Sequence, residues 1–165
     1  MKNNFRPCLL IFFTLILIAL VNACSSINNP TYGPVKDGNA QNVLLESIAD
    51  DTQEVVFYSR AIWYPNKNGF NFFPAGKKSR KGVIIYTDRS VYFAEWASKQ
   101  YKPIFSLNYD QISELRLAAS DLFGRMVIKT DSYNSFEILG IDGPDLPNKE
   151  ETNIAFQILE QQKTN

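Results

Sequence analysis

The chain has 165 residues, with 17 basic and 17 acidic side chains and no histidine. The absence of histidine excludes Ser-His-Asp and Cys-His catalysis, histidine metal sites and the commonest general base. The chain has no overall basic charge that would indicate a nucleic-acid partner. It also has no C-x-x-C motif, no G-x-G-x-x-G motif and no Walker phosphate loop. We therefore expect no enzymatic activity, no cofactor, no metal site and no nucleic-acid binding.

The first expected element is an export signal over residues 1–23. Lys2 and Arg6 precede an apolar run, residues 9–21, which only Thr14 interrupts. This run is too short to span a hydrocarbon core of about 30 Å as a helix. A basic segment before a short apolar one is typical of a cleaved signal, and the alternative is a retained membrane anchor.

The end of this signal, "LVNACSS" (residues 20–26), resembles the lipobox of bacterial lipoproteins. The resemblance implies cleavage before Cys24, a diacylglyceryl group on its sulfur and acylation of the new amine. Two or more acyl chains hold a protein stably on a bilayer. The domain would then lie on the exported side: at the periplasmic face of the outer membrane in a cell with two membranes, as Ser25 and Ser26 suggest, and otherwise at the outer face of the cell membrane. The alternative is an ordinary secretory signal with a free Cys24.

Residues 24–40, "CSSINNPTYGPVKDGNA", are rich in Ser, Asn, Pro and Gly, which predicts a flexible tether before a domain over residues 41–165. Apolar side chains at helical spacing predict a short amphipathic helix over residues 42–50. The β-branched and aromatic residues of 52–64 then predict a long strand.

Alternating polar and apolar residues predict six further strands, each with one buried and one wet face, over 82–87, 90–96, 102–109, 112–119, 124–130 and 135–139. Asn148 can cap a last amphipathic helix over residues 149–163. From that helix we expect Ile154, Ile158 and Leu159 to face the sheet. The expected interior of the sheet consists of Val83, Ile85, Val91, Phe93, Leu115, Leu117, Phe136 and Ile138.

Three stretches in this order resemble the GRAM and related pleckstrin-homology-like (PH-like) domains: "GVIIYTDRSVYF", "KPIFSLNYDQISELRL" and "LFGRMVIKTDSYNSFEIL". The resemblance implies a mainly β fold with α: a strongly bent, seven-stranded antiparallel barrel capped by the C-terminal amphipathic helix. A sheet with one apolar face must in any case curl or be covered. The alternatives are an eight-stranded lipocalin-like barrel and an α+β sheet with both helices on one face.

The stretch "FNFFPAGKKSRKG" (residues 70–82) lies between the long strand and the next hairpin and combines aromatic with basic residues. In pleckstrin-homology domains a basic first loop often holds phosphorylated head groups, and Lys67, Lys78 and Arg80 resemble that pattern. An anionic membrane attracts each nearby basic residue with about 1 kcal/mol. The alternative is an ordinary solvated loop. The candidate contacts to anionic lipid are Lys67, Phe70, Phe72, Phe73, Lys77, Lys78, Arg80 and Lys81.

Two further groups have a structural and a functional interpretation. Asp142 and Asp145 form a turn or, alternatively, offer oxygens to a calcium ion. Trp63, Tyr64 and Trp96 pack in the fold or, if exposed on one side, mark a partner site.

Two functions are compatible with the sequence. The first is a membrane-tethered, non-enzymatic binding domain that contacts anionic lipid head groups or envelope phosphates through the basic loop of residues 65–81. The second is a protein-interaction or scaffold lipoprotein of the cell envelope that uses a sheet edge or a groove at the C-terminal helix.

Overall fold

The structure is a computed structural model that describes residues 31–36, 40–48, 53–66, 79–118 and 124–164. The expected signal, Cys24 and most of the basic loop lie outside these residues. Among the described residues, no helix is both long and apolar enough to cross a bilayer. The elements are α2 (Ala40–Ile48), β1 (Val55–Asn66), β2 (Arg80–Thr87), β3 (Ser90–Ala97), β4 (Gln100–Asn108), the 3-10 turn η1 (Tyr109–Gln111), β5 (Glu114–Leu117), β6 (Met126–Lys129), β7 (Tyr133–Ile138) and α3 (Lys149–Thr164).

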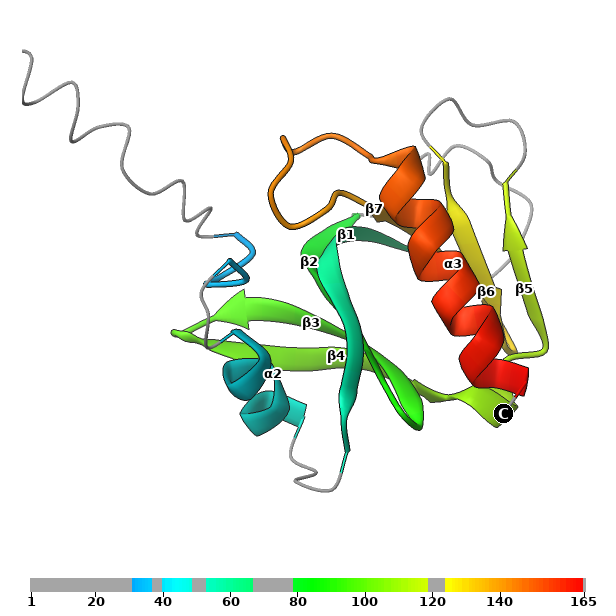
Figure 1. The fold of residues 1–165 in the computed structure, drawn as a ribbon, viewed down its shortest axis with the longest axis horizontal. Coiled ribbons are helices and arrows are strands. Elements are labelled where there is room, and N and C mark those ends of the chain that lie inside the picture. The colour runs from blue at the N-terminus through cyan, green and yellow to red at the C-terminus, as the bar shows by residue number, and fades with distance from the viewer. Residues whose placement is uncertain (1–30, 37–39, 49–52, 67–78, 119–123, 165) are drawn as a thin grey trace, which may run out of the picture.

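The strands form one antiparallel sheet of seven in the order β4-β3-β2-β1-β7-β6-β5. β1 joins its two halves, because residues 55–63 pair with β2 and residues 61–66 pair with β7. The sheet bends strongly around β1 (Figure 1), and the expected mainly β fold with a C-terminal helix is confirmed. The prediction of a barrel is wrong in one respect: β4 and β5 do not pair, because η1 leads the chain round the corner between them.

Helix α3 lies against β5, β7 and η1 and covers the inner side of the bent sheet (Figure 1). Asn148 caps it as expected: its side-chain oxygen accepts hydrogen bonds from the backbone N–H groups of Glu150 and Glu151, at 3.0 and 3.2 Å. Ala155 and Leu159 are fully buried against the inner core. That core consists of Ala61, Trp63, Ile84, Tyr86, Val91, Phe93, Leu107, Tyr109, Ile112, Met126, Ile128, Phe136, Ile138, Ala155 and Leu159.

The face of α3 differs in part from the one expected. Leu159 is buried and Ile158 packs at the edge of the inner core, but Ile154 is 41% exposed, so its predicted place against the sheet is wrong. Thr152, Ala155 and Leu159 define the buried face. Successive helical residues turn by about 100°, which carries Ile154 away from the sheet when Ala155 faces it.

A second core lies on the outer face of β1–β4. It contains Tyr32, Val35, Leu44, Val83, Ile85, Ala94, Tyr101 and Leu139. Val83 and Ile85 therefore do not belong to the inner core, and Ile84 and Tyr86 take the places predicted for them. β2 therefore lacks the solvent-exposed face that the sequence analysis expected, because α2 and residues 31–36 cover its outer side.

The two helices thus lie against different cores, which excludes the alternative of an α+β sheet with both helices on one face. Seven strands in an open sheet exclude the eight-stranded lipocalin-like barrel. The remaining members of the expected interior, Val91, Phe93, Phe136 and Ile138, are in the inner core, with Leu115 and Leu117 packed at its edge.

The packed domain also includes residues 31–36, which the sequence analysis assigned to the tether. Tyr32 and Val35 are each only 1% exposed. The Tyr101 hydroxyl donates a hydrogen bond to the Tyr32 carbonyl at 3.0 Å. Gly33 has a φ of +69° and lies so close to Trp96 that a Cβ would come within 2.6 Å of the indole ring. Both cores consist of residues from Tyr32 onward, so a chain that starts at Ser25 keeps all of them.

Candidate functional site

One end of the sheet brings together the segments that flank the basic loop. Trp63 near the end of β1 pairs with Arg80 at the start of β2. The turn between β3 and β4 lies at the same end, because β3 runs antiparallel to β2. The stem of the β1–β2 loop and the β3–β4 turn are therefore neighbours.

Of the eight candidate lipid contacts, the structure describes Arg80 and Lys81; the other six lie outside the described residues. Arg80 holds Glu95 through two hydrogen bonds, from Nε to Oε1 at 2.7 Å and from Nη2 to Oε2 at 2.8 Å. The Lys81 ammonium lies 3.9 Å from a carboxylate oxygen of Asp145 and 6.0 Å from the centre of the Tyr32 ring. Both cations at the stem are thus partly neutralised within the domain.

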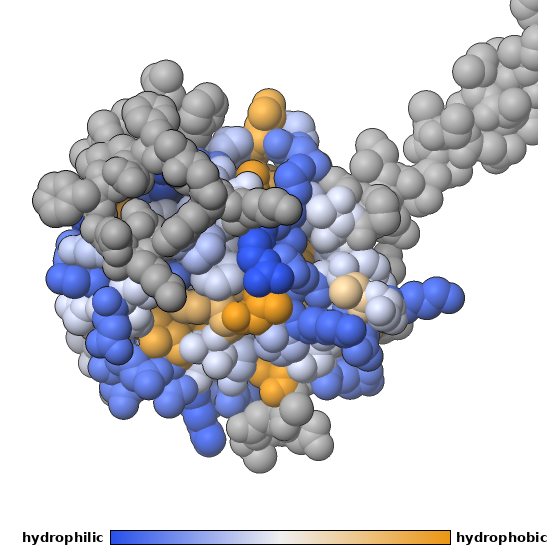
Figure 2. Space-filling view, turned by 180° about the vertical axis from the view of Figure 1, so that it is seen from behind, coloured by the Kyte–Doolittle hydropathy of each residue, from blue (hydrophilic) through white to orange (hydrophobic). Residues whose placement is uncertain are grey.

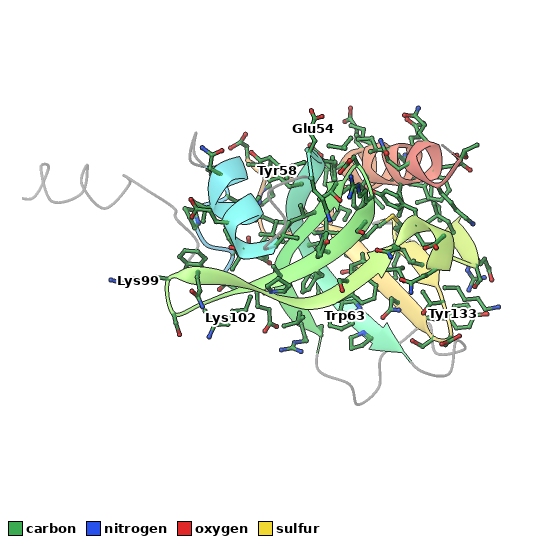
Figure 3. The ribbon with its side chains drawn as sticks, turned by 90° about the horizontal axis from the view of Figure 1, so that it is seen from below. Glu54, Tyr58, Trp63, Lys99, Lys102 and Tyr133 are labelled. Carbon is green, nitrogen blue, oxygen red and sulfur yellow. The ribbon has the colours of Figure 1, made fainter. Side chains whose placement is uncertain are left out.

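The β3–β4 turn adds a basic feature that the sequence analysis did not single out. Ser98 and Lys99 have φ values of 54° and 65°, and two successive residues of positive φ are typical of the type I′ hairpin turn. Lys99, Gln100 and Lys102 are exposed. Figure 3 shows Lys99 pointing away from the body of the molecule, at the end where α2 lies. A two-residue gap between alternating segments is the signal that could have located this turn.

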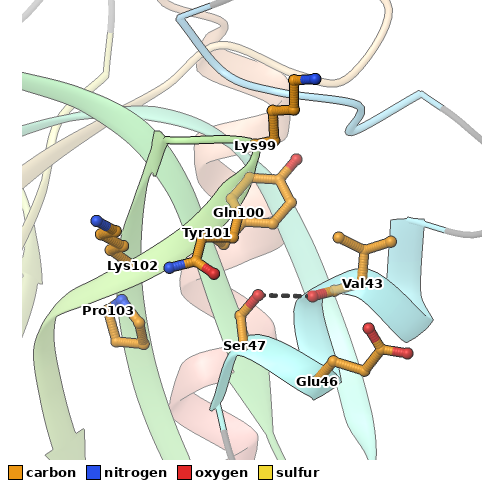
Figure 4. A pocket seen from close by; sticks show the side chains of 8 residues that line it. All are labelled: Val43, Glu46, Ser47, Lys99, Gln100, Tyr101, Lys102 and Pro103. Atoms are coloured by element: carbon orange, nitrogen blue, oxygen red, sulfur yellow. Dashed lines mark hydrogen bonds between the residues drawn. The ribbon is translucent and has the colours of Figure 1, made fainter.

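A hollow of about 450 Å³ lies between α2 and the start of β4. Figure 4 shows lysines of the hairpin on one side of it and α2 on the other. Ser47 of α2 donates a hydrogen bond from its hydroxyl to the Val43 carbonyl at 2.7 Å. The lining consists of Val43, Glu46, Ser47, Lys99, Gln100, Tyr101, Lys102 and Pro103.

A second hollow, of about 500 Å³, lies at the opposite end of β3 and β4. Its lining mixes both signs of charge, with Asp88 and Asp110 beside Arg89 and Lys163. Arg89 already lies 3.6 Å from Asp88. This balance gives the second hollow no preference for an anion or a cation.

Arg60 organises the connection between β7 and α3. It is 4% exposed, and its guanidinium donates hydrogen bonds to the Gly140 carbonyl at 2.7 Å, to the Gly143 carbonyl and to the Asp145 carboxylate at 2.9 Å. It also lies 5.4 Å from the centre of the Tyr32 ring. Burial, and to a smaller extent the Asp145 carboxylate, raises the pKa of Tyr32 to about 12.

The segment from Asp142 to Asp145 therefore has a structural partner for its last carboxylate. Asp142 is largely exposed, and its carboxylate lies 3.6 Å from the Lys36 ammonium. Asp145 is engaged by both Arg60 and Lys81. Among the described residues no group of three or more potential ligands could hold a metal ion. These contacts favour the interpretation of this segment as a turn.

The three large aromatic residues pack within the fold. Trp63 is 8% exposed, stacks against Phe136 and donates a hydrogen bond from Nε1 to Asn134 at 3.1 Å. Tyr64 donates its hydroxyl to Glu137 at 2.8 Å, and burial raises its pKa well above the ordinary range. Trp96 meets the Tyr101 ring edge to face, with the ring centres 4.8 Å apart. A partner site made of these aromatics is thus not favoured.

Figure 2 shows orange residues close to one another across the middle of one face, among white and blue ones. In the described part of the chain, the large apolar residues that are exposed are Val56, Leu146 and Ile154. Most of the coloured surface in this view is blue or white.

Solved structures resemble this fold, although no protein-family model and no curated protein sequence matches the chain. The C-terminal domain of an unknown protein from Leishmania infantum aligns with a TM-score of 0.54 at 18% identity, over 77% of this chain and all of that one. The DH/PH domain of human ARHGEF11, in a complex with RhoA and its inhibitor, aligns with a TM-score of 0.54 at 11% identity, over 74% of this chain and 32% of that one. The DH/PH fragment of PDZRHOGEF, in a complex with human RhoA, aligns with a TM-score of 0.52 at 13% identity, over 79% of this chain and 34% of that one.

These likenesses define the class of the fold. The bent, open seven-stranded sheet with a C-terminal helix is a PH-like fold, as the sequence resemblance implied. The chain spans about a third of the length of the two DH/PH chains. At identities this low the likeness establishes the fold, and the function has to be argued from the site.

Proposed function

We propose that this protein is a non-enzymatic binding domain, anchored by lipid at Cys24 to the exported side of a bacterial membrane, and that it contacts anionic lipid head groups. The observation that carries the proposal is the docking of residues 31–36. They pack at the end of the sheet where the stem of the basic loop and the β3–β4 turn lie. The stretch from Cys24 to Thr31 reaches at most about 25 Å, which would keep this end near the bilayer.

The basic loop would supply the attraction to the membrane. Because Arg80 and Lys81 already have acidic partners, we assign the attraction mainly to Lys67, Lys77 and Lys78. Each would contribute about 1 kcal/mol near an anionic surface, within a Debye length of roughly 8–10 Å. The three phenylalanines of the loop would add apolar contact. Since the lipid already fixes the location, this contact would set the orientation of the domain.

Cys24→Ala is expected to abolish anchoring. The variant has no sulfur for the diacylglyceryl group, so it should be found in the soluble fraction or keep the unprocessed signal. Fractionation followed by mass spectrometry of the N-terminal peptide measures both. Membrane-bound protein with an unmodified Cys24 or an intact segment 1–23 would contradict the proposed anchor.

Lys77→Ser with Lys78→Ser is expected to weaken binding to anionic vesicles by roughly tenfold to thirtyfold. The protein should start at Ser25, because a start after residue 40 removes Tyr32 and Val35 from the outer core. Sedimentation with phosphatidylcholine vesicles, with and without added phosphatidylglycerol, at low and high salt measures the effect. The matched control is Lys149→Ser with Lys163→Ser, which removes two exposed charges from α3. Equal, negligible binding to both vesicle types would contradict the lipid contact.

A protein-interaction or scaffold role is the second candidate. The observation in its favour is that β4 and β5 end the sheet without pairing to each other, and unpaired strand edges accept further strands. Similar folds occur in DH/PH fragments crystallised with human RhoA. Crosslinking of the acylated protein in its native envelope, followed by identification of the captured lipids and proteins, distinguishes the two roles.

A further inference from the structure

We propose that residues 31–36 form a releasable strap that sets how far the domain reaches from its membrane anchor. The inference rests on the proposed function, because it requires the lipid at Cys24. While the strap is docked, the chain from Cys24 to Thr31 spans at most about 25 Å. Once the strap has left the domain, the free chain ends at Ala40, where α2 begins, and spans at most about 55 Å. Release would more than double the reach of the domain.

Side-chain packing holds the strap in its docked position. Tyr32 and Val35 belong to the outer core, and each is 1% exposed. The guanidinium of Arg60 lies 5.4 Å and the ammonium of Lys81 6.0 Å from the centre of the Tyr32 ring, distances at which a cation is attracted to an aromatic ring. The docked state is therefore a specific one.

Few polar contacts join the strap to the rest of the domain. No residue of the strap belongs to a strand of the sheet. Within the described residues, one hydrogen bond joins residues 32–36 to another element: the Tyr101 hydroxyl donates to the Tyr32 carbonyl at 3.0 Å. Lys36 adds an ion pair of 3.6 Å with the largely exposed Asp142, and such exposed pairs contribute little.

The hydroxyl of Tyr32 favours release. It is buried, and it has no hydrogen-bond partner among the described residues. In water the same hydroxyl donates and accepts hydrogen bonds, so docking removes its solvation without replacing it. Part of the gain from burying the Tyr32 ring is thereby lost, which brings the docked and the released states closer in free energy.

The rest of the fold does not depend on the strap. The inner core contains no residue of the strap. In the outer core, α2 contributes Leu44 on its own account. Figure 1 shows residues 31–36 in blue, separate from α2 and beside the ends of β3 and β4. We therefore expect the sheet and both helices to persist when the strap leaves.

Gly33 offers a change that prevents docking. Its φ is +69°, and a Cβ at this position would lie 2.6 Å from the indole ring of Trp96. Alanine would be strained in this conformation and would collide with the ring, whereas the released chain accepts it without strain. Gly33→Ala should release the strap and leave the remaining contacts of the domain unchanged.

The first test measures release as trypsin cleavage after Lys36 in the protein that starts at Ser25. Lys36 is the first basic residue of this protein. Trypsin binds the residues around the cleaved bond in an extended form, so Val35 has to leave the outer core first. When opening and closing are fast, the cleavage rate follows the population of the open form. Synthetic peptides of residues 25–45 with the same substitutions correct for the preference of the protease.

We expect Tyr32→Phe, which removes the unpartnered hydroxyl, to slow cleavage by about fivefold or more. Its matched control is Tyr101→Phe, which loses the hydroxyl that bonds the strap and should be cleaved about threefold to tenfold faster. Gly33→Ala should be cleaved at least about tenfold faster. Amide hydrogen exchange in β6 and β7 should be the same in all variants, which shows that the domain stays folded.

The second test measures the reach of the acylated protein on vesicles. A dye is attached at Lys99→Cys, because Lys99 points away from the domain at the end where the strap lies (Figure 3). Energy transfer from this dye to acceptors in the bilayer should fall by about twofold or more on Gly33→Ala, and it should rise on Tyr32→Phe.

Tyr32→Phe cleaved as fast as the unchanged protein, or Gly33→Ala cleaved no faster, would overturn the releasable strap. Faster cleavage of Gly33→Ala with unchanged energy transfer would overturn its role in setting the reach. Failure of the proposed anchor is distinguishable from both results, because it appears in the fractionation of Cys24→Ala, whereas the cleavage test uses a protein without lipid.

Discussion

Arg60→Met is expected to lower the free energy of unfolding by about 3 kcal/mol. The buried guanidinium bonds the carbonyl groups of Gly140 and Gly143, and a hydrogen bond to a charged group contributes about 1.5–3 kcal/mol. The side chain of Asp145 is 37% exposed and can regain water, so the loss is assigned mainly to the two carbonyls. Because domains are stable by about 5–15 kcal/mol, this change removes a substantial part of the total.

Urea unfolding monitored by tryptophan fluorescence measures this loss. Arg60→Lys keeps the charge, but its single ammonium cannot reach all the partners of the planar guanidinium, so we expect an intermediate loss. Arg89→Met is the matched control, because the side chain of Arg89 is 61% exposed and pairs with the neighbouring Asp88 alone among described residues. It should change the stability by less than about 1 kcal/mol. Arg60→Met unfolding at the same urea concentration as Arg89→Met would refute the role of Arg60.

Leu159→Ala is expected to cost about 2–5 kcal/mol, because the Leu159 side chain is fully buried in the inner core and its truncation leaves a cavity. Ile154→Ala on the same helix is expected to change the stability by no more than about 0.5 kcal/mol, since Ile154 is 41% exposed. Alanine preserves the helix at both positions, so the difference reports packing alone.

Thermal melting of the two variants, with circular dichroism to confirm the helix content, decides the orientation of α3. A large loss at Leu159 with little change at Ile154 agrees with the structure. The reverse order would mean that α3 is rotated, with Ile154 against the sheet as the sequence analysis expected.

The strands could be predicted because polar and apolar residues alternate along a strand that has one buried face. The predicted segments 82–87 and 90–96 nearly coincide with β2 and β3, and the helix over 149–163 with α3. The prediction was weaker where a strand is buried on both faces. The run from Val83 to Tyr86 is apolar throughout, so the pattern alone could not say that Ile84 and Tyr86 face the inner core.

The candidate site was predictable only in its local composition. The sequence shows that Lys77, Lys78, Arg80 and Lys81 are close along the chain. It could not show that Arg80 pairs with Glu95 on the neighbouring strand β3, or Lys81 with Asp145 in the distant connection between β7 and α3. The partners of a charge depend on how separate strands align, and neither composition nor spacing specifies that alignment.

The sequence by itself thus determined the order of the strands and helices and the cap at Asn148, because these follow from local periodicity and turn chemistry. The PH-like class was implied by the resemblance of three stretches to known domains. The tertiary structure alone decided three things: that the sheet stays open between β4 and β5, that residues 31–36 join the outer core, and that Lys99 and Lys102 border a hollow with α2. Each depends on contacts between segments far apart in the chain. Such contacts form because apolar surface is buried wherever the fold brings it together, and no single segment carries that information.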